Sequence, residues 1–326
     1  MNLRAAYQRA RGYVGMKVNG VSFLIDIIDA CSSRCPSCPV GIYPSKGGHK
    51  MMMDVFRKVL DKAESECKIR KVQLYRWCDP LLHPLVHEFV EECVRRGIRA
   101  SVSSDLQATT CDFPKLMLSG LAEFRVSFSG WRGMHYYQRP ATPEKFFKKF
   151  DYINSLPCHS STKKVMFFHI YKDNEDEVHR ARVIAGANRY EFVAFPATYM
   201  MYDRIVNQSY LPEDEEILRR LLETPEENIA RFKHRPRHDD YCELQEKEVV
   251  LDSYGRMKQC QLMGFWDEYN RGDFLTIPMK DIRKKIMTDP MCPRCKATGV
   301  PTYSLIFADP AVAEDPISSA DDDKYV

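Results

Sequence analysis

The sequence predicts an α/β fold, because short apolar runs that suit strands alternate with longer runs that suit helices. The six strand-like runs are Val21–Ile28, Lys71–Tyr75, Arg99–Ser103, Phe124–Phe128, Val165–Tyr171 and Tyr190–Phe195. The five helical runs between them are Met52–Glu66, Leu85–Arg96, Phe113–Ser119, Pro143–Ser155 and Glu175–Ala185. Strands that alternate with helices form parallel sheets, so residues 21–196 are expected to build an open or barrel-like parallel sheet.

Local signals mark where several of these helices begin and end. In Leu85–Arg96, apolar side chains recur at helical spacing, and Gly97 follows the basic last turn as a stop signal. Cys93 falls on that apolar face, which predicts a core residue. Thr142 precedes a proline at a first helical position, and Thr224–Glu227 adds the glutamate of a capping box.

Composition divides the rest of the chain into four further parts. Residues 1–20 are basic, contain no acidic side chain, and are expected to form a helix that covers the sheet. Residues 197–241 are charged and helical in character, which predicts a bridge to a cysteine-bearing second module at residues 242–306. Residues 307–326 hold six acidic side chains and two prolines, and are predicted to be an acidic disordered tail.

The composition also limits the class of protein. The chain has 326 residues, 44% of them hydrophobic, and twelve cysteines that follow no apolar signal segment. We therefore expect free thiols in a reducing compartment, the cytoplasm, and no membrane span. Without the tail the charge is +8, from 47 basic and 39 acidic residues, which suits a nucleic-acid or phosphorylated partner but also an ordinary solvated surface.

The most informative motif is Cys31-x-x-x-Cys35-x-x-Cys38, which directly follows the first apolar run. Three thiolates from one short loop can hold a cubic iron–sulfur cluster and leave one iron open to a substrate. The alternative is a zinc knuckle, which needs a fourth ligand nearby, and His49 is the candidate. The spacing favours the cluster.

A second set of four cysteines follows in the C-terminal module: Cys242, Cys260, Cys292 and Cys295. The residues between the first two read as a hairpin that turns near residues 253–255. Four thiolates make a closed site, suited to zinc or to a four-iron cluster. Cys67, Cys111 and Cys158 have no partner spacing and are interpreted as packing residues.

The two cysteine patterns together resemble those of the radical S-adenosylmethionine (SAM) superfamily with a SPASM/twitch-type auxiliary domain. The resemblance implies a partial (β/α)6 TIM-like barrel with a small C-terminal domain of the twitch type, built from a β-hairpin and helices. It also implies a SAM-binding [4Fe-4S] cluster on the first cysteine set and an auxiliary [4Fe-4S] cluster on the second. Four protein ligands favour electron transfer at the auxiliary cluster.

The same resemblance implies residues that bind SAM. The segment from Tyr75 to Pro84 is similar to the motif that receives the amino group, the end of the third strand to the ribose site, and the segment from Phe128 to Arg139 to the loop that holds the carboxylate. Arg139 is the candidate for that carboxylate and Arg132 its competitor. The expected cofactor-binding set is Cys78, Asp79, Pro80, Ser104, Asp105, Ser129 and Arg139.

Two residues are candidates for a catalytic role near the end of the fifth strand. Two-residue alternation puts Val165, Phe167, His169 and Tyr171 on one face. The sites of barrel enzymes lie at the carboxyl ends of strands, so His169 and Tyr171 are predicted substrate contacts or a base. A satisfied core histidine is the alternative for His169.

The implied reaction is reductive cleavage of SAM to a 5′-deoxyadenosyl radical that abstracts a hydrogen atom from a substrate, which is then oxidised or rearranged. A polar small molecule is the first expectation, since fewer than 25 residues precede the first strand and leave no room for a leader-binding domain. A flavodoxin or ferredoxin would supply electrons. The alternatives are a maturase of ribosomal peptides, an enzyme that modifies a nucleotide or nucleic-acid base, and a zinc-stabilised interaction module.

Overall fold

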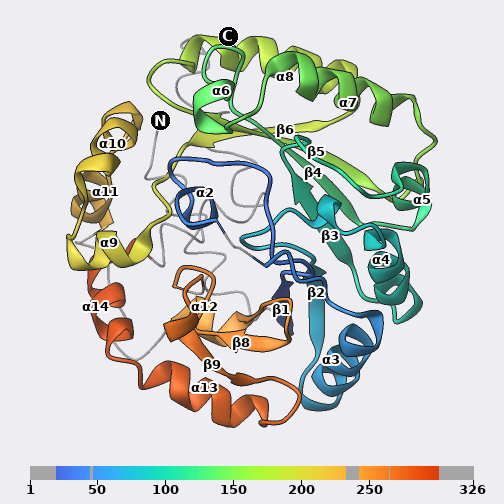
Figure 1. The fold of residues 1–326 in the computed structure, drawn as a ribbon, viewed down its shortest axis with the longest axis vertical. Coiled ribbons are helices and arrows are strands. Elements are labelled where there is room, and N and C mark those ends of the chain that lie inside the picture. The colour runs from blue at the N-terminus through green and yellow to red at the C-terminus, as the bar shows by residue number, and fades with distance from the viewer. Residues whose placement is uncertain (1–19, 45–46, 233–241, 264, 301–326) are drawn as a thin grey trace.

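The computed structural model describes residues 20–300, apart from residues 45–46, 233–241 and 264. The predicted covering helix at 1–20 and the predicted tail at 307–326 lie outside this part of the chain, except for residue 20. Within it, strands and helices form an incomplete ring around a short helix, α2 (Pro39–Ile42) (Figure 1).

Six parallel strands form the first part of the sheet, and they confirm the predicted α/β class. They are β1 (Val21–Ile25), β2 (Ile69–Gln73), β3 (Ala100–Ser104), β4 (Glu123–Phe128), β5 (Lys163–Ile170) and β6 (Glu191–Pro196). Each pairs in parallel with the next, in the order β6-β5-β4-β3-β2-β1. The sheet is open, as in a partial TIM-like barrel.

Five helices cover the outer face of this sheet: α3 (Met53–Glu66), α4 (Val86–Arg95), α5 (Phe113–Leu118), α7 (Pro143–Ser155) and α8 (Val178–Ala187). The strand side chains that face them form the main core, and Phe23, Val72 and Val126 are fully buried in it. Alternate residues point to the inner side of the sheet, as the period of two requires. The inner face therefore carries polar residues such as Asp26 and Arg125, which belong to none of the hydrophobic clusters of the described residues.

The predicted helix signals are present in the structure. Thr142 accepts a hydrogen bond from the main-chain nitrogen of Lys145 at 3.3 Å. Thr224 and Glu227 form a reciprocal capping box, with bonds of 3.2 and 2.7 Å. Gly97 has a φ of +70°, the left-handed conformation that ends a helix at low cost when the residue is glycine.

Short elements follow the carboxyl ends of the strands and then lead away from the sheet. η1 (Pro80–Leu82), α6 (Met134–Tyr137) and η2 (Glu175–Glu177) follow β2, β4 and β5. The bridge consists of α9 (Tyr202–Asn207), η3 (Pro212–Asp214), α10 (Glu215–Arg220) and α11 (Pro225–Phe232). A buried ion pair of 2.5 Å between Arg204 and Asp214 joins α9 to η3.

The C-terminal part continues the same sheet. Its elements are α12 (Glu243–Lys247), β7 (Glu248–Leu251), β8 (Arg256–Lys258), η4 (Asp267–Tyr269), β9 (Asn270–Asp273), α13 (Met279–Met287) and α14 (Met291–Thr298). The predicted hairpin is β7–β8, and Gly255 in its turn has a φ of +77°. β7 also pairs in parallel with β1, so the sheet has nine strands.

This pairing joins the predicted second module to the first part of the sheet. The open edge of β1 offers unpaired main-chain groups, and β7 satisfies them. The C-terminal part from residue 242 onward, here called the auxiliary region, is thereby held against β1, the strand that precedes the first cysteine loop. None of the helices in the described ranges is long and apolar enough to cross a membrane.

Candidate active site

The loop that follows β1 gathers the first three cysteines. Cys38 lies at the start of α2, and its main-chain nitrogen donates to the oxygen of Cys35 at 3.2 Å. Burial raises the pKa of all three thiols, and repulsion from Cys38 and Cys31 raises that of Cys35 further. Cysteines bind metal as thiolates, and three thiolates this close together need a cation to offset their charge, so a soft metal group fits this donor set.

The sulfur atoms of Cys31, Cys35 and Cys38 do not surround one position that a single metal ion could occupy. Among the residues that the structure describes, no group of three or more histidine, cysteine, aspartate or glutamate side chains could hold one metal ion. In a cubic cluster each thiolate binds a different iron, so the sulfur atoms need not converge on one point.

A close contact with Gly41 shapes the cysteine loop. A Cβ atom at Gly41 would overlap the main-chain nitrogen and oxygen of Cys35 and would lie 2.9 Å from the carbonyl carbon of Arg34. Only glycine lets α2 lie this close to the loop. The sequence analysis did not single out Gly41, although it lies three residues after Cys38.

His49, the alternative fourth ligand for zinc, is engaged elsewhere. Its ring stacks on Tyr254 with 3.9 Å between centroids and a 15° interplanar angle. Its Nδ1 lies 3.2 Å from the hydroxyl oxygen of Ser253. His49 thus packs against the turn of the β7–β8 hairpin.

Asp26 organises the loop after β2, a role that the sequence analysis missed. Its carboxylate accepts hydrogen bonds from the main-chain nitrogens of Arg76, Trp77 and Cys78, at 2.7, 3.0 and 3.1 Å. Burial raises the pKa of Asp26 to about 6, and these three bonds oppose the rise. Asp26 could have been noticed in the sequence, because it is a charged residue within the first apolar run.

The residues predicted to bind the amino group of SAM follow this loop. Asp79 caps η1, where it accepts from the main-chain nitrogen of Leu81 at 2.9 Å, and Pro80 is the first residue of that turn. The hydroxyl of Ser104 donates to the same carboxylate at 2.7 Å. Burial, together with the charge of Asp105, raises the pKa of Asp79 to about 7.

The residues predicted to bind the ribose of SAM contact the first cysteine loop directly. The hydroxyl of Ser33 donates to the carboxylate of Asp105, and burial raises the pKa of Asp105. Both Asp105 and Asp79 lie near enough to Cys31 to raise its pKa further, and Cys78 is also close to Cys31. The structure thus brings Cys78, Asp79, Ser104 and Asp105 together beside the first cysteine set.

The loop after β4 is held by its neighbours. The nitrogen of Ser129 donates to Gln138 at 3.1 Å, and its oxygen accepts from Asn174 at 3.0 Å. Gly130 has a φ of +84°, and a Cβ atom there would overlap the carboxylate of Glu177. The main chain around Ser129 is therefore fixed against the segment that follows β5.

The two arginine candidates differ in their surroundings. Arg132 pairs with Asp176 and, at 3.1 Å, with Glu177. The exposed guanidinium of Arg139 lies 5.3 Å from the ring centroid of Tyr136, and its main-chain oxygen accepts from the nitrogen of Arg34 at 2.5 Å. Among the described residues Arg139 makes no salt bridge, so it is the better placed of the two to meet a carboxylate.

His169 lies on the inner face of β5 and is half-buried. Its ring contacts that of Phe195 edge to face, with 4.9 Å between centroids. The surrounding protein lowers the pKa of His169 to about 4. The side chain is neutral at neutral pH and binds a proton weakly.

Tyr171 lies beside the first cysteine loop. It lies beyond the end of β5, stacks on Tyr137 with 3.5 Å between centroids, and interacts with Ser37 of the cysteine loop. Val165 and Phe167, earlier in the strand, belong to a different hydrophobic cluster from Tyr171. Burial raises the pKa of Tyr171, so its hydroxyl stays protonated and cannot serve as a base near neutral pH.

The second cysteine set lines one cavity. Cys242, Cys260, Cys292 and Cys295 surround it together with Gln245, Gln259, Met263 and Met291. Nε2 of Gln245 and Nε2 of Gln259 donate to the sulfur of Cys292 at 2.8 and 2.9 Å, and burial raises the pKa of all four thiols. Four thiols around one cavity and hydrogen bonds to sulfur fit a metal group.

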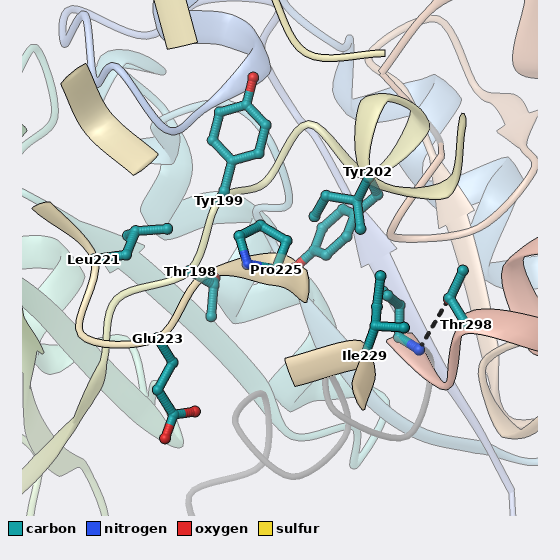
Figure 2. Close-up of a pocket in the computed structure, with 10 residues that line it drawn as sticks. Thr198, Tyr199, Tyr202, Leu221, Glu223, Pro225, Ile229 and Thr298 are labelled. Carbon is teal, nitrogen blue, oxygen red and sulfur yellow. Dashed lines mark hydrogen bonds between the residues drawn. The ribbon is translucent and has the colours of Figure 1, made fainter. Parts of the chain in front are cut away.

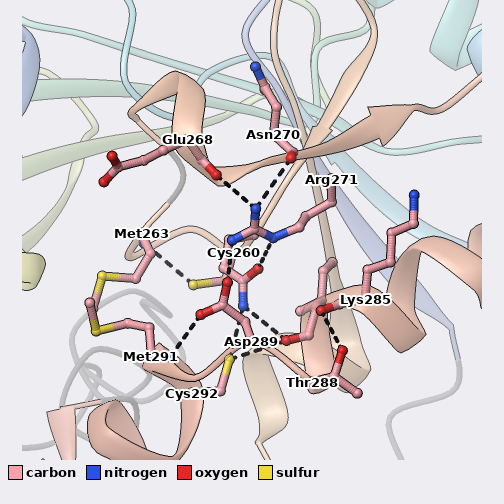
Figure 3. Close-up of polar contacts among 12 residues, drawn as sticks. Cys260, Met263, Glu268, Asn270, Arg271, Lys285, Thr288, Asp289, Met291 and Cys292 are labelled. Atoms are coloured by element: carbon pink, nitrogen blue, oxygen red, sulfur yellow. Dashed lines mark hydrogen bonds and ion pairs between the residues drawn. The ribbon is translucent and has the colours of Figure 1, made fainter.

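Arg271 supports this second set (Figure 3). Its guanidinium donates to the side-chain oxygen of Gln259 and pairs with Asp289. A third bond, of 2.8 Å, goes to the main-chain oxygen of Glu268. Arg271 thereby fixes the amide that donates to Cys292.

The other cysteines are mostly packing residues, as predicted. Cys93 is fully buried, and Cys67 and Cys111 pack against the main core. Cys158 is exposed, so its interpretation as a packing residue was wrong: it lies in the loop after α7, where no neighbouring element covers it.

A further cavity lies between the bridge and α14 (Figure 2). It is lined mainly by aromatic and apolar side chains, including Tyr199, Tyr202 and Ile229, and it contains none of the predicted site residues.

Comparison with known proteins gives structural matches only. No family model matches the sequence, and no curated protein matches it. The structure of Streptococcus suis SuiB bound to precursor peptide SuiA has a TM-score of 0.56 at 13% identity, over 89% of this chain and 69% of SuiB. Native anSMEcpe with bound AdoMet has a TM-score of 0.52 at 14% identity, over 80% of each chain. The chain has the fold of radical SAM enzymes with a SPASM/twitch-type domain.

Proposed function

We propose that this chain, which has the radical SAM fold with a twitch-type C-terminal region, is an enzyme that cleaves SAM reductively and oxidises or rearranges a polar small molecule. The observation that carries the proposal is the set of three neighbouring, half-buried cysteines, Cys31, Cys35 and Cys38, with Asp79 and Asp105 beside it. These thiols would hold a [4Fe-4S] cluster. When bound, the cluster supplies the electron that splits SAM into methionine and a 5′-deoxyadenosyl radical, which removes a hydrogen atom from the substrate.

The side chains around the first cysteine set would bind and orient SAM. Asp79, held by Ser104 and capping η1, is fixed to accept hydrogen bonds from the amino group. Asp105, held by Ser33, would accept from the ribose hydroxyls. Ser129 lies in the fixed loop after β4, and Arg139 would pair with the carboxylate.

The second cysteine set would hold the auxiliary [4Fe-4S] cluster. Cys242, Cys260, Cys292 and Cys295 supply four ligands and leave no position for substrate, which favours electron transfer. The hydrogen bonds from Gln245 and Gln259 to Cys292 would stabilise the more negative, reduced state of such a cluster. A flavodoxin or ferredoxin would deliver the electron for the first cleavage.

The inner face of β5 and β6 would contact the substrate. Phe167 and Phe195 provide an apolar surface, and neutral His169 offers a hydrogen-bonding group next to it. The low pKa of His169 favours a substrate contact over a strong base.

A peptide substrate is the second candidate. The SuiB structure was solved with a precursor peptide bound, and SuiB shares the fold of this chain. Incubation with reductant and SAM in the presence of candidate sugars, cyclitols or peptides separates the two, because only the true substrate consumes SAM with matched product formation.

The test of the main proposal is iron and sulfide content after anaerobic reconstitution, together with 5′-deoxyadenosine formation from SAM. The native chain should hold about eight irons, and the variant with Cys31, Cys35 and Cys38 changed to alanine about four, without nucleoside formation. Cys158→Ala is the matched control, because Cys158 is exposed and lies outside both sets. Zinc in place of iron in the native chain would refute the proposal.

A further inference from the structure

Two buried hydrogen-bond donors lie without partners between the two cysteine sets. They are Nε1 of Trp77 and Nε2 of Gln261, and neither has a hydrogen-bond partner within the described part of the chain. The side chains of Trp77 and Gln261 are only 7% and 6% exposed. Buried donors are almost always satisfied in folded proteins, by protein groups, by water or by a ligand, so these two donors call for an acceptor from outside the described residues.

Arg76 connects these two residues. Its Nε donates to the main-chain oxygen of Gln261 at 2.7 Å, and a second guanidinium nitrogen donates to the same oxygen. The guanidinium carbon lies 3.8 Å from the ring centroid of Trp77. The residues that carry the two donors therefore both contact the guanidinium of Arg76.

The carboxylate of Asp26 is already engaged by the loop itself. It accepts from the main-chain nitrogens of Arg76, Trp77 and Cys78. Its carboxylate thus holds the loop in place and is not directed at the two donors. What remains for a ligand is two N–H donors beside a guanidinium, which is a site for an acceptor with negative charge.

The position of this site relates it to the reaction. Arg76 and Asp26 both affect the pKa of Cys38, and Gln261 directly follows Cys260. Trp77 also contacts Phe265, with 6.3 Å between ring centroids. A ligand held here lies between the first cysteine set and the second, where a substrate must be if it is to react with a SAM-derived radical and pass an electron onward.

We propose that Trp77 and Gln261 bind a carboxylate of the substrate, so that the enzyme acts on a small carboxylic acid. The inference rests on the proposed function, because it assigns the substrate class of that same site. The indole N–H and the amide N–H would each donate to one carboxylate oxygen, and Arg76 would contribute charge. This site is separate from Arg139, the candidate for the carboxylate of SAM, which lies after β4.

The test is NMR of the reconstituted, SAM-bound protein with 15N-labelled tryptophan, titrated with acetate and, as a neutral control, acetamide. The chain has three tryptophans, and Trp77→Phe identifies the indole signal of Trp77 by its loss. We expect acetate to shift this signal downfield and acetamide to have little effect. Gln261→Leu should weaken acetate binding about tenfold. Trp131→Phe, which alters a ring packed against Phe128 and Phe147, should leave it unchanged.

Three outcomes would overturn the inference. If neither acetate nor acetamide moves the signal, the donors are satisfied by water; if both move it equally, the site does not select charge. If Trp77→Phe weakens SAM binding in parallel with acetate binding, the donors serve SAM itself. In each case 5′-deoxyadenosine formation by the native enzyme still decides the proposed function separately.

Discussion

The guanidinium of Arg76 donates to the main-chain oxygen of Gln261 at 2.7 Å, and this bond ties the loop after β2 to the residue that follows Cys260. Together with the β1–β7 pairing, it fixes the auxiliary region against the barrel-like sheet at a second point. The two cysteine sets are thus connected by one main-chain strand pairing and by one bond from a side chain to the main chain. Such contacts can keep two redox centres at a constant separation.

Arg76→Met should loosen this connection. Loss of a hydrogen bond from a charged donor costs about 1.5–3 kcal/mol, so amide hydrogen exchange over residues 261–263 should accelerate tenfold or more. Exchange in β4 should stay unchanged. Arg57→Met, which removes a half-exposed partner of Glu92, is the control and should alter neither region. Unchanged exchange after Arg76→Met would show that the bond contributes nothing to the junction.

Gly41→Ala should damage the first cysteine loop selectively. The added methyl group would overlap the main chain of Cys35, so the loop must move and its thiols with it. Iron content should fall from about eight to about four per chain, while the second set stays loaded. Gly186→Ala is the matched control, because a Cβ atom at Gly186 in α8 meets nothing within 4 Å. Full iron content in Gly41→Ala would contradict the tight approach.

The sequence predicted the parts of this fold that have local signals. The six parallel strands follow from apolar runs, and the helix ends at Thr142 and Gly97 follow from cap chemistry. The hairpin between the first two cysteines of the second set was also predictable, because its turn has a glycine.

Long-range relationships had no such signal. The pairing of β7 with β1 depends on an open edge that exists only once the sheet has formed. Gly41 could be recognised only when α2 lay on the cysteine loop, and Asp26 only when the loop after β2 met its carboxylate.

Gln259→Leu should lower the reduction potential of an auxiliary cluster. The amide donates to the sulfur of Cys292 at 2.9 Å, and hydrogen bonds to cluster sulfur favour the reduced state. Redox titration followed by electron paramagnetic resonance should show a shift of tens of millivolts. The signal of the first cluster provides the internal control, and equal shifts in both clusters would contradict a local effect. Gln245→Leu should act in the same direction.

Asp26→Asn should change how stability depends on pH. Burial raises the folded-state pKa of Asp26 to about 6 from 3.8, so between these values the folded protein holds a proton that the unfolded chain has lost. The free energy of unfolding of the native chain therefore falls as pH rises from about 4 to about 6. An asparagine does not titrate, so its free energy of unfolding lacks this decline.

The measurement is denaturation of both proteins at pH 5 and pH 7 under anaerobic conditions. Between these values the free energy of unfolding of Asp26→Asn should rise by about 1 kcal/mol relative to that of the native chain. Asp79 titrates in both proteins, so its contribution cancels in this difference. Parallel pH profiles would mean that Asp26 is already ionised at pH 5, and that its three hydrogen bonds with Arg76, Trp77 and Cys78 outweigh its burial.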